Sequence, residues 1–316
     1  MKKQAMLALG LSLTMLLTAC GGSQKEEESQ PEARLTVVAT TYPVYLLASA
    51  VAENVDGVVV ERLNTGTVSC LHDYTLTVSD MKLIEGADVI AMNGAGLEDF
   101  MDDALSAAQG SVIDCSEGVQ LLEAVGHEHH DGDEEEGEHY DPHIWMDPEN
   151  AITMVENIQK GLVQVDPDNQ QTYQENMLKA TTFLNSWDSD LEALLNWDEG
   201  PEITGLITFH DGFQYFAKAF DLPLLATIEE EEGSEASAQV INETVSLVKE
   251  NNIPVIFTEV NGSDATAQAI ARETGCQVGQ LTMLMDGTDS SLEAYYNGLK
   301  SNVAAIVNGF AGEELQ

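Results

Sequence analysis

The stretch Leu35–Leu63, LTVVATTYPVYLLASAVAENVDGVVVERL, joins two apolar runs through an amphipathic segment. The runs Leu35–Ala39 and Val58–Arg62 have the length and β-branched content of strands, and Pro43–Asn54 between them has a helical pattern. A strand, a helix and a second strand within about 30 residues are typical of a βαβ unit with parallel strands. The stretch therefore predicts an α/β fold.

The same alternation continues along the chain and then recurs in its second half. In the first half it predicts strands at Asp88–Met92 and Ser111–Asp114, with helices at Val78–Glu85 and Leu97–Ala108. In the second half it predicts four strands, Gly205–Phe209, Leu224–Thr227, Pro254–Thr258 and Gln277–Leu281, and four helices, Gly212–Phe220, Ala238–Glu250, Ala265–Thr274 and Leu292–Asn308.

A long helix is expected between the two halves. Asn169–Asn196 contains no Gly or Pro, and its apolar residues recur every three or four positions. We therefore expect two doubly wound α/β lobes with mainly parallel sheets, joined by a long rigid helix. The predicted boundaries are 34–167 for the first lobe, 168–196 for the linking helix and 197–316 for the second lobe.

The charge of the chain is strongly negative. Its 316 residues include 12 Lys and Arg against 55 Asp and Glu, a net charge of −43, while 43% of the residues are hydrophobic, enough for globular cores. Nucleic acid is excluded as a partner because its phosphates need a basic surface, and adhesion to anionic lipid through surface charge is disfavoured for the same reason. Cations are the partners that such a surface attracts.

The first 19 residues have the pattern of a signal peptide. Lys2 and Lys3 precede the apolar run Ala5–Leu17, which is short for a membrane span, and Leu-Thr-Ala-Cys20 follows. This junction resembles the lipobox of bacterial lipoproteins, which implies a lipid on Cys20, a flexible tether at 20–33 and an extracytoplasmic protein held at the membrane by that lipid. The alternative is an ordinary signal peptide with an incidental cysteine.

Three cysteines remain beyond Cys20: Cys70, Cys115 and Cys276. An odd number leaves at least one thiol without an intramolecular partner, and there is no CxxC motif. The favoured interpretation is that they are small buried apolar residues. Cys70 lies two residues before His72 and could approach a metal.

The segment 126–140, GHEHHDGDEEEGEHY, contains four histidines and seven acidic residues but no basic or aliphatic residue. Such a composition cannot form a core and predicts a mobile loop. Its histidines, His127, His129, His130 and His139, offer weak, exchangeable sites for zinc capture. The alternative is a solvated acidic insert whose histidines are incidental.

The other three histidines, His72, His143 and His210, occupy comparable places near strand ends or helix starts. Ligands in open α/β sheets collect beyond the carboxyl ends of the strands, so we expect all three to face one cleft. Neutral imidazole is a good zinc ligand, and three would fill three of four tetrahedral positions. Each also has a carboxylate close by that could orient its ring.

These residues lie in motifs that resemble the zinc/manganese class of substrate-binding lipoproteins of ABC importers. The matching segments are His72-Asp73-Tyr74, GAGLEDF (94–100), DPHIWMDP (141–148), TFHDG (208–212) and IFTE (256–259). The resemblance, which runs from about Arg34 to the C-terminus, implies a monomeric receptor that is not an enzyme. It also implies His72, His143 and His210 as ligands, with an ABC permease and its ATPase as partners.

The ligand set favours zinc over manganese. Manganese-type members usually carry a carboxylate at the third position, where this chain has His210, and manganese prefers oxygen ligands. The resemblance places the fourth ligand at an Asp in a Leu-Asp motif, but the matching segment here is Leu281-Thr282-Met283. Asp286 is the first candidate to replace it, and Asp289, a loop residue or water are the others.

Two other functions remain as alternatives. Three histidines with an open fourth position also suit a catalytic zinc, and an exported zinc hydrolase would use Glu259 or Asp211 as its base. The nearest approach to HExxH, His127-Glu128-His129-His130-Asp131, lacks the second required histidine. The remaining alternative is a surface adhesin or metal-sequestering lipoprotein.

Overall fold

The computed structural model describes residues 34–63, 74–124, 140–195, 200–229, 236–260 and 262–312. The predicted signal peptide, Cys20, the tether, Cys70, His72 and the four loop histidines lie outside these residues. Residues from 33 onward cluster as one compact unit, and the predicted lobe boundaries stay predictions. Within the described residues, no helix has the length and apolar character needed to cross a bilayer.

The first sheet has four parallel strands in the order β2-β1-β3-β4. Its strands are β1 (Leu35–Ala39), β2 (Val58–Arg62), β3 (Val89–Met92) and β4 (Ser111–Asp114), and its helices are α1 (Tyr42–Val51), α2 (Val78–Gly86) and α3 (Asp102–Ala107). Side chains alternate across the sheet, so Val38 and Ile90 pack with residues of α2 and α3, while Val37 and Val89 belong to the core on the other face.

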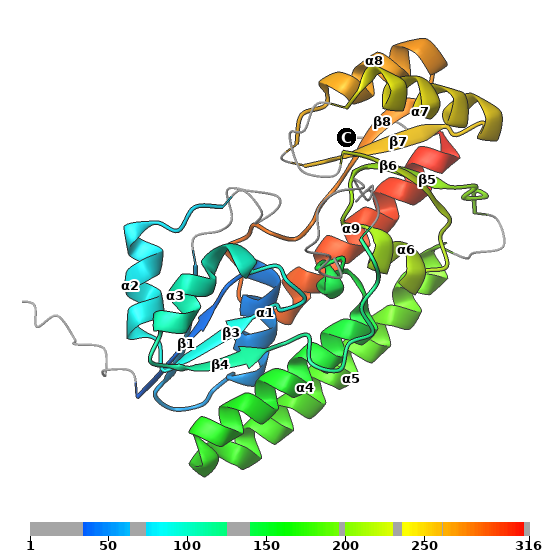
Figure 1. Ribbon diagram of the computed structural model, residues 1–316. Coiled ribbons are helices and arrows are strands. Elements are labelled where there is room, and N and C mark those ends of the chain that lie inside the picture. Colours follow the sequence, from blue (N-terminus) through cyan, green and yellow to red (C-terminus); the bar gives the residue numbers. More distant parts are fainter. Residues whose placement is uncertain are drawn as a thin grey trace, which may run out of the picture. The chain divides into compact units, whose positions relative to one another are not determined.

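The second sheet repeats this order as β6-β5-β7-β8, again with parallel strands. Its strands are β5 (Leu206–His210), β6 (Leu224–Glu229), β7 (Val255–Glu259) and β8 (Gln277–Leu281), and its helices are α6 (Gln214–Ala219), α7 (Ala238–Asn251), α8 (Ala265–Thr274) and α9 (Leu292–Ala311). Helices α7 and α8 cover one face of the sheet, and α9 packs beside β8 (Figure 1). The predicted two-lobe α/β fold is confirmed.

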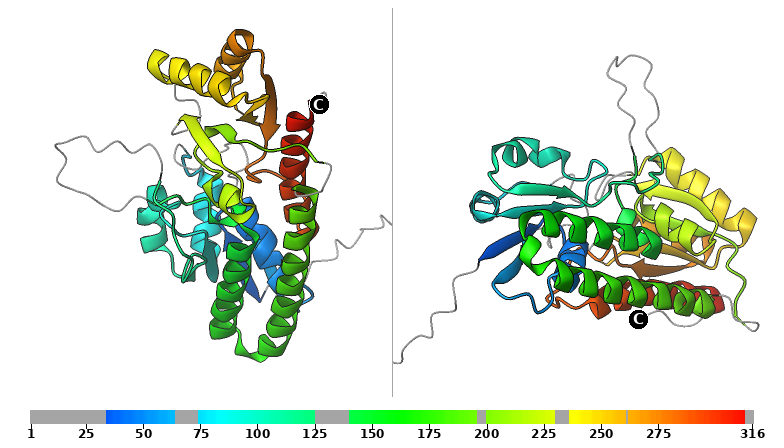
Figure 2. Two further views of the ribbon diagram at one scale, coloured as in Figure 1. Left: turned by 90° about the vertical axis from the view of Figure 1, so that its right-hand side faces the viewer. Right: turned by 90° about the horizontal axis from the view of Figure 1, so that it is seen from below.

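The predicted long helix is α5 (Gln170–Leu195), which forms a hairpin with α4 (Pro148–Val165); Figure 2 shows the two side by side. At 26 residues it is about 39 Å long. It is not the only connection between the halves, because α9 packs against both α5 and α1 as well as against β8. One continuous apolar core therefore runs through both halves.

The helix predicted over Leu97–Ala108 was wrong at its start. The chain first makes a turn in which Gly94, Ala95 and Gly96 all have positive φ, then a short 3-10 helix, η1 (Asp99–Met101), before α3 begins at Asp102. That left-handed turn precedes Leu97, where a Cβ on Gly94 would collide with the Asp114 carboxylate. Within the predicted helix, Glu98 and Met101 have ψ values of 13° and 15°, which depart from α-helical geometry and delay the start of α3. The apolar spacing alone does not reveal this turn.

The cysteine prediction can be compared at two positions. Cys115 is buried and Cys276 is half-buried, and both are free thiols. Burial raises the pKa of the Cys115 thiol well above its ordinary value, which makes it unreactive.

Arg34, at the start of β1, is tied to the turn between α4 and α5. Its guanidinium donates to both carboxylate oxygens of Asp166, at 3.0 and 2.7 Å, and Tyr173 and Asn169 also donate to that carboxylate. The Arg34 hydrogen bonds are the main reason that the pKa of Asp166 is lowered to about 2 from its ordinary value of 3.8. The ionised carboxylate therefore stabilises the folded state.

Replacing Asp166 by Asn is expected to lower the free energy of unfolding at pH 7 by about 1–2 kcal/mol, a modest value because Arg34 is half exposed. In the unchanged protein this contribution is complete above pH 3.8 and is lost as the pH falls toward 2. Urea unfolding at pH 7 and at pH 2 measures both effects. Asp168→Asn, at an exposed neighbour, is the matched control, and equal stability of the two variants at pH 7 would contradict the prediction.

Candidate metal centre

His143 lies just before the short helix η2 (Ile144–Met146), and its ring is held by Asp141. One Asp141 oxygen accepts from the backbone N–H of His143 at 2.9 Å and lies 2.7 Å from the ring Nδ1. Both side chains are buried. A proton on Nδ1 satisfies this carboxylate and places the lone pair on Nε2, the nitrogen that a metal would use.

His210 is the last residue of β5 and faces His143 directly. The two Nε2 atoms are 3.1 Å apart and the rings are nearly perpendicular, at 88°. On its other side, His210 Nδ1 lies 3.6 Å from Glu259, which ends the neighbouring strand β7. The carboxyl ends of these adjacent parallel strands, on either side of the point where the strand order reverses, thus provide one candidate ligand and a carboxylate beside its ring.

The spacing of the two nitrogens fits a tetrahedral zinc ion. With Zn–N distances of about 2.0–2.1 Å, two ligands of a tetrahedron lie roughly 3.3 Å apart, and the observed separation is 3.1 Å. Within the described ranges no third His, Cys, Asp or Glu completes a metal-ligating group. His72 lies outside them, and Asp286 is exposed, with its carboxylate accepting from Gly287 N–H, so both stay predictions.

A buried carboxyl group connects the first sheet to the His143 segment. Glu98 accepts hydrogen bonds from Thr40 and from the backbone of Asn93 and Gly94, at the carboxyl ends of β1 and β3. The side-chain amide of Asn93 donates to the backbone carbonyl of Pro142 at 2.9 Å, next to His143. Burial raises the Glu98 pKa to about 7. The first sheet therefore contacts the His143 segment through the Asn93 side chain, which donates to the backbone carbonyl next to His143.

Trp145 connects the same segment to the second half of the chain. Its indole N–H donates to Met283 O at 2.9 Å, its own carbonyl accepts from the Tyr295 hydroxyl at 2.6 Å, and its ring packs edge-on against His143. Sequence reasoning did not assign roles to Trp145, Tyr295 or Glu98. Trp145 lies in the motif DPHIWMDP and Glu98 in the motif GAGLEDF, both quoted above. No local pattern indicates Tyr295, which lies 150 residues from Trp145.

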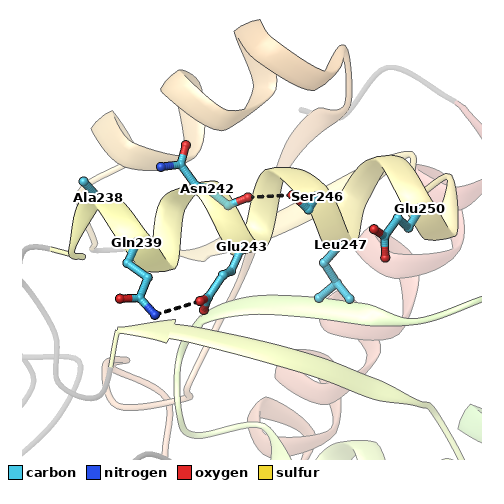
Figure 3. Close-up of a pocket in the computed structure, with 7 residues that line it drawn as sticks. All are labelled: Ala238, Gln239, Asn242, Glu243, Ser246, Leu247 and Glu250. Atoms are coloured by element: carbon cyan, nitrogen blue, oxygen red, sulfur yellow. Dashed lines mark hydrogen bonds between the residues drawn. The ribbon is translucent and has the colours of Figure 1, made fainter.

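A shallow hollow elsewhere has a different character. It runs along α7 and is lined by seven residues (Figure 3): Ala238, Gln239, Asn242, Glu243, Ser246, Leu247 and Glu250. Two of its polar side chains bond along the helix: Gln239 donates to Glu243, and Ser246 donates to the Asn242 carbonyl. The lining includes no histidine, so the histidine pair is the better candidate site.

The model of the family described as zinc-uptake complex component A, periplasmic, matches residues 37–309. The chain belongs to this family. The match includes both histidines of the pair and the segments that position them. The family's description is that of a component of a zinc-uptake complex.

Several curated relatives carry zinc or metal transport in their names. The zinc-binding protein AdcA of Streptococcus pyogenes is 27% identical over 304 residues, covering 90% of this chain and 58% of AdcA, and the zinc-binding lipoprotein AdcA of Streptococcus pneumoniae is 28% identical, with 97% and 60% covered. The chain thus spans about three fifths of these proteins. The metal ABC transporter substrate-binding lipoprotein SsaB of Streptococcus sanguinis is 26% identical, with 98% and 100% covered.

Solved structures agree with the fold. A crystal structure of ZnuA superposes with a TM-score of 0.74 at 26% identity, covering 87% of this chain and 98% of ZnuA. The binding protein FpvC of Pseudomonas aeruginosa, in complex with Mn²⁺, gives 0.75 at 26%, with 88% and 99% covered. A mutant of the laminin-binding adhesin Lmb of Streptococcus agalactiae gives 0.74 at 25%, with 87% and 99% covered.

Replacing Asp141 by Asn is expected to lower zinc affinity about 10- to 100-fold, the usual effect of losing a carboxylate that orients a histidine ligand. The amide keeps the shape of the side chain but removes the charge that holds Nδ1–H of His143. Competition with a chromophoric chelator measures the affinity. Glu117→Gln, at an exposed carboxylate, is the control, and a loss of less than about threefold for Asp141→Asn would contradict the proposed role.

Proposed function

We propose that the protein is an extracytoplasmic, lipid-anchored receptor that binds Zn²⁺ between its two lobes and delivers it to an ABC import permease with its ATPase. The observation that carries this proposal is the pair of buried imidazole nitrogens, His143 Nε2 and His210 Nε2, 3.1 Å apart. The two histidines come from opposite halves of the chain, so an ion bound by both joins the halves.

The donor set supports zinc as the transported ion. Both groups facing the site are imidazole nitrogens, which suit zinc better than manganese, and each ring has a carboxylate on its Nδ1 side. His72 is proposed as the third ligand and Asp286 as a candidate fourth. The names of the AdcA relatives, which specify zinc, support the same ion.

The predicted capture loop extends this function. We propose that His127, His129, His130 and His139, together with the acidic residues around them, bind zinc weakly and pass it to the histidine pair. Deleting Glu128–Glu138 should reduce zinc uptake under scarcity while leaving tight binding unchanged. Unchanged uptake under scarcity would contradict the role of the loop.

Membrane attachment through Cys20 is part of the proposal. The lipobox-like junction supports it, as do the lipoprotein names of two relatives. Metabolic labelling with a radioactive fatty acid should label the protein, and Cys20→Ser should abolish the label and release the protein from the membrane fraction.

The decisive experiment is a metal titration of the protein lacking its first 19 residues, followed by uptake in cells that lack the gene. We expect one tightly bound zinc per chain, preference for zinc over manganese, and zinc uptake restored by the unchanged gene. Absence of stoichiometric zinc binding would refute the proposal.

Adhesion is a second candidate because a structural relative at 25% identity is a laminin-binding adhesin. Measuring the binding of the metal-free protein and of the zinc-saturated protein to immobilised laminin tests this function directly. Adhesion without any uptake defect on gene deletion would favour this function over transport.

A further inference from the structure

The turn that follows β8 brings a methionine side chain to the histidine pair. Met283 lies two residues beyond the end of β8 and is 3% exposed. A Cβ placed on Gly212 would lie 3.1 Å from Met283 Sδ and 2.7 Å from His210 Cδ2, so the sulfur and this ring carbon are at most 5.8 Å apart. Cδ2 is bonded to Nε2, the nitrogen that faces His143.

The backbone on both sides of this sulfur is firmly held. Asn302 of α9 accepts from Thr282 N–H at 2.8 Å and donates to Thr282 O at 2.9 Å, while Trp145 donates to Met283 O. The next residue, Leu284, has a φ of 59°, a conformation that a bulky side chain adopts only when its surroundings enforce it. The main chain of Met283 is therefore fixed, while its thioether retains the flexibility of an unbranched side chain.

The Met283 sulfur can approach the His210 ring because residue 212 is a glycine and has no side chain. Any Cβ at Gly212 would collide with the terminal methyl of Met283 and crowd the His210 ring. Because Gly212 follows His210 by two residues, the ligand-bearing strand and the sulfur-bearing turn meet at this point.

We propose that Met283 is a soft donor at this site, contacting thiophilic closed-shell divalent cations such as Cd²⁺ and raising their affinity relative to zinc. The inference rests on the proposed function, in which the histidine pair holds a divalent metal. A neutral, polarisable thioether favours soft cations and contributes little to oxygen-preferring ions such as Mn²⁺. The sulfur lies within 5.8 Å of His210 Cδ2, the carbon bonded to Nε2, so a rotation of the flexible thioether brings it to an ion held at that nitrogen.

The test compares Cd²⁺ and Zn²⁺ affinities of the unchanged protein with those of Met283→Leu. Leucine keeps a similar apolar volume and the backbone carbonyl that Trp145 uses, and replaces the thioether by a shorter, branched hydrocarbon without a donor atom. We expect Cd²⁺ affinity to fall about tenfold while zinc affinity changes less than threefold. Met154→Leu, at a fully buried methionine of α4, is the matched control and should leave the ratio of the two affinities unchanged.

A second measurement uses the unchanged protein labelled with ¹³C at its methionine methyl groups. The NMR signal of the Met283 methyl group is identified by its nuclear Overhauser effect to the His210 ring. Its chemical shift should change more on adding Cd²⁺ than on adding Zn²⁺. An unchanged affinity ratio in Met283→Leu, or equal methyl shifts with both ions, would overturn the role of Met283 while zinc binding remains. Failure of the unchanged protein to bind zinc at all would instead refute the proposed function.

Discussion

Replacing either His143 or His210 by Ala should reduce zinc affinity by at least about 100-fold, a loss of roughly 2.7 kcal/mol of binding free energy. Each variant removes one of two nitrogens that converge at 3.1 Å, and the remaining ligands cannot close a tetrahedral site without it. Competition against a chelator of known affinity, at constant pH, measures the loss.

The matched control is His139→Ala in the predicted capture loop, the same substitution at a histidine that is not proposed for the tight site. It should leave stoichiometric binding unchanged. Unfolding curves of the metal-free variants separate a lost ligand from a lost fold. Tight binding retained by both His143→Ala and His210→Ala in folded protein would exclude the histidine pair as the metal site.

Replacing Trp145 by Ala should lower the free energy of unfolding by about 3–5 kcal/mol, the usual cost of removing a buried aromatic side chain. Trp145 is 1% exposed and packs in the core that runs through both halves, so the surroundings cannot easily close the cavity. The substitution also leaves the buried carbonyl of Met283 without its indole donor. Denaturant unfolding of the metal-free protein measures the change.

Trp145→Phe separates packing from hydrogen bonding. It retains most of the apolar volume but loses the indole N–H, and we expect a cost of about 1–3 kcal/mol. Tyr295→Phe removes the hydroxyl that donates to Trp145 O, on the other side of the same contact. A cost below about 1 kcal/mol for Trp145→Ala would show that this contact does not hold the two halves together.

Most strands could be predicted because their pattern is local. Leu35–Ala39, Val58–Arg62, Ser111–Asp114 and Gln277–Leu281 have the same bounds in the structure as in the prediction. A short apolar run bounded by turn residues indicates a strand largely by itself, and this holds for the edge strands β2, β4 and β8 as well as for the buried β1. The start of α3 was predicted five residues too early, because Glu98 and Met101 leave α-helical geometry although the apolar spacing around them favours a helix.

Of the two helices that connect the halves of the chain, α5 and α9, only α5 was predicted to do so. The uninterrupted pattern of Asn169–Asn196 indicates α5, because the absence of Gly and Pro and the apolar spacing lie within one segment. The second contribution, from α9, depends on its packing against α1 and α5, which are far from it in sequence. Hydrophobic periodicity shows that a helix has an apolar face but not what covers it.

By itself, the sequence predicted the α/β class, the place of His210 at a strand end, and a set of histidine ligands that would favour zinc. Only the tertiary structure decided that the Nε2 atoms of His143 and His210, 67 residues apart in sequence, lie 3.1 Å from each other. It also decided that Asp141 lies beside Nδ1 of His143 and Glu259 beside Nδ1 of His210, and that the Met283 side chain approaches the His210 ring. The physical reason is that residue chemistry and local pattern are properties of short segments. Distances between separate segments are instead fixed by how the two sheets and α9 pack around one core.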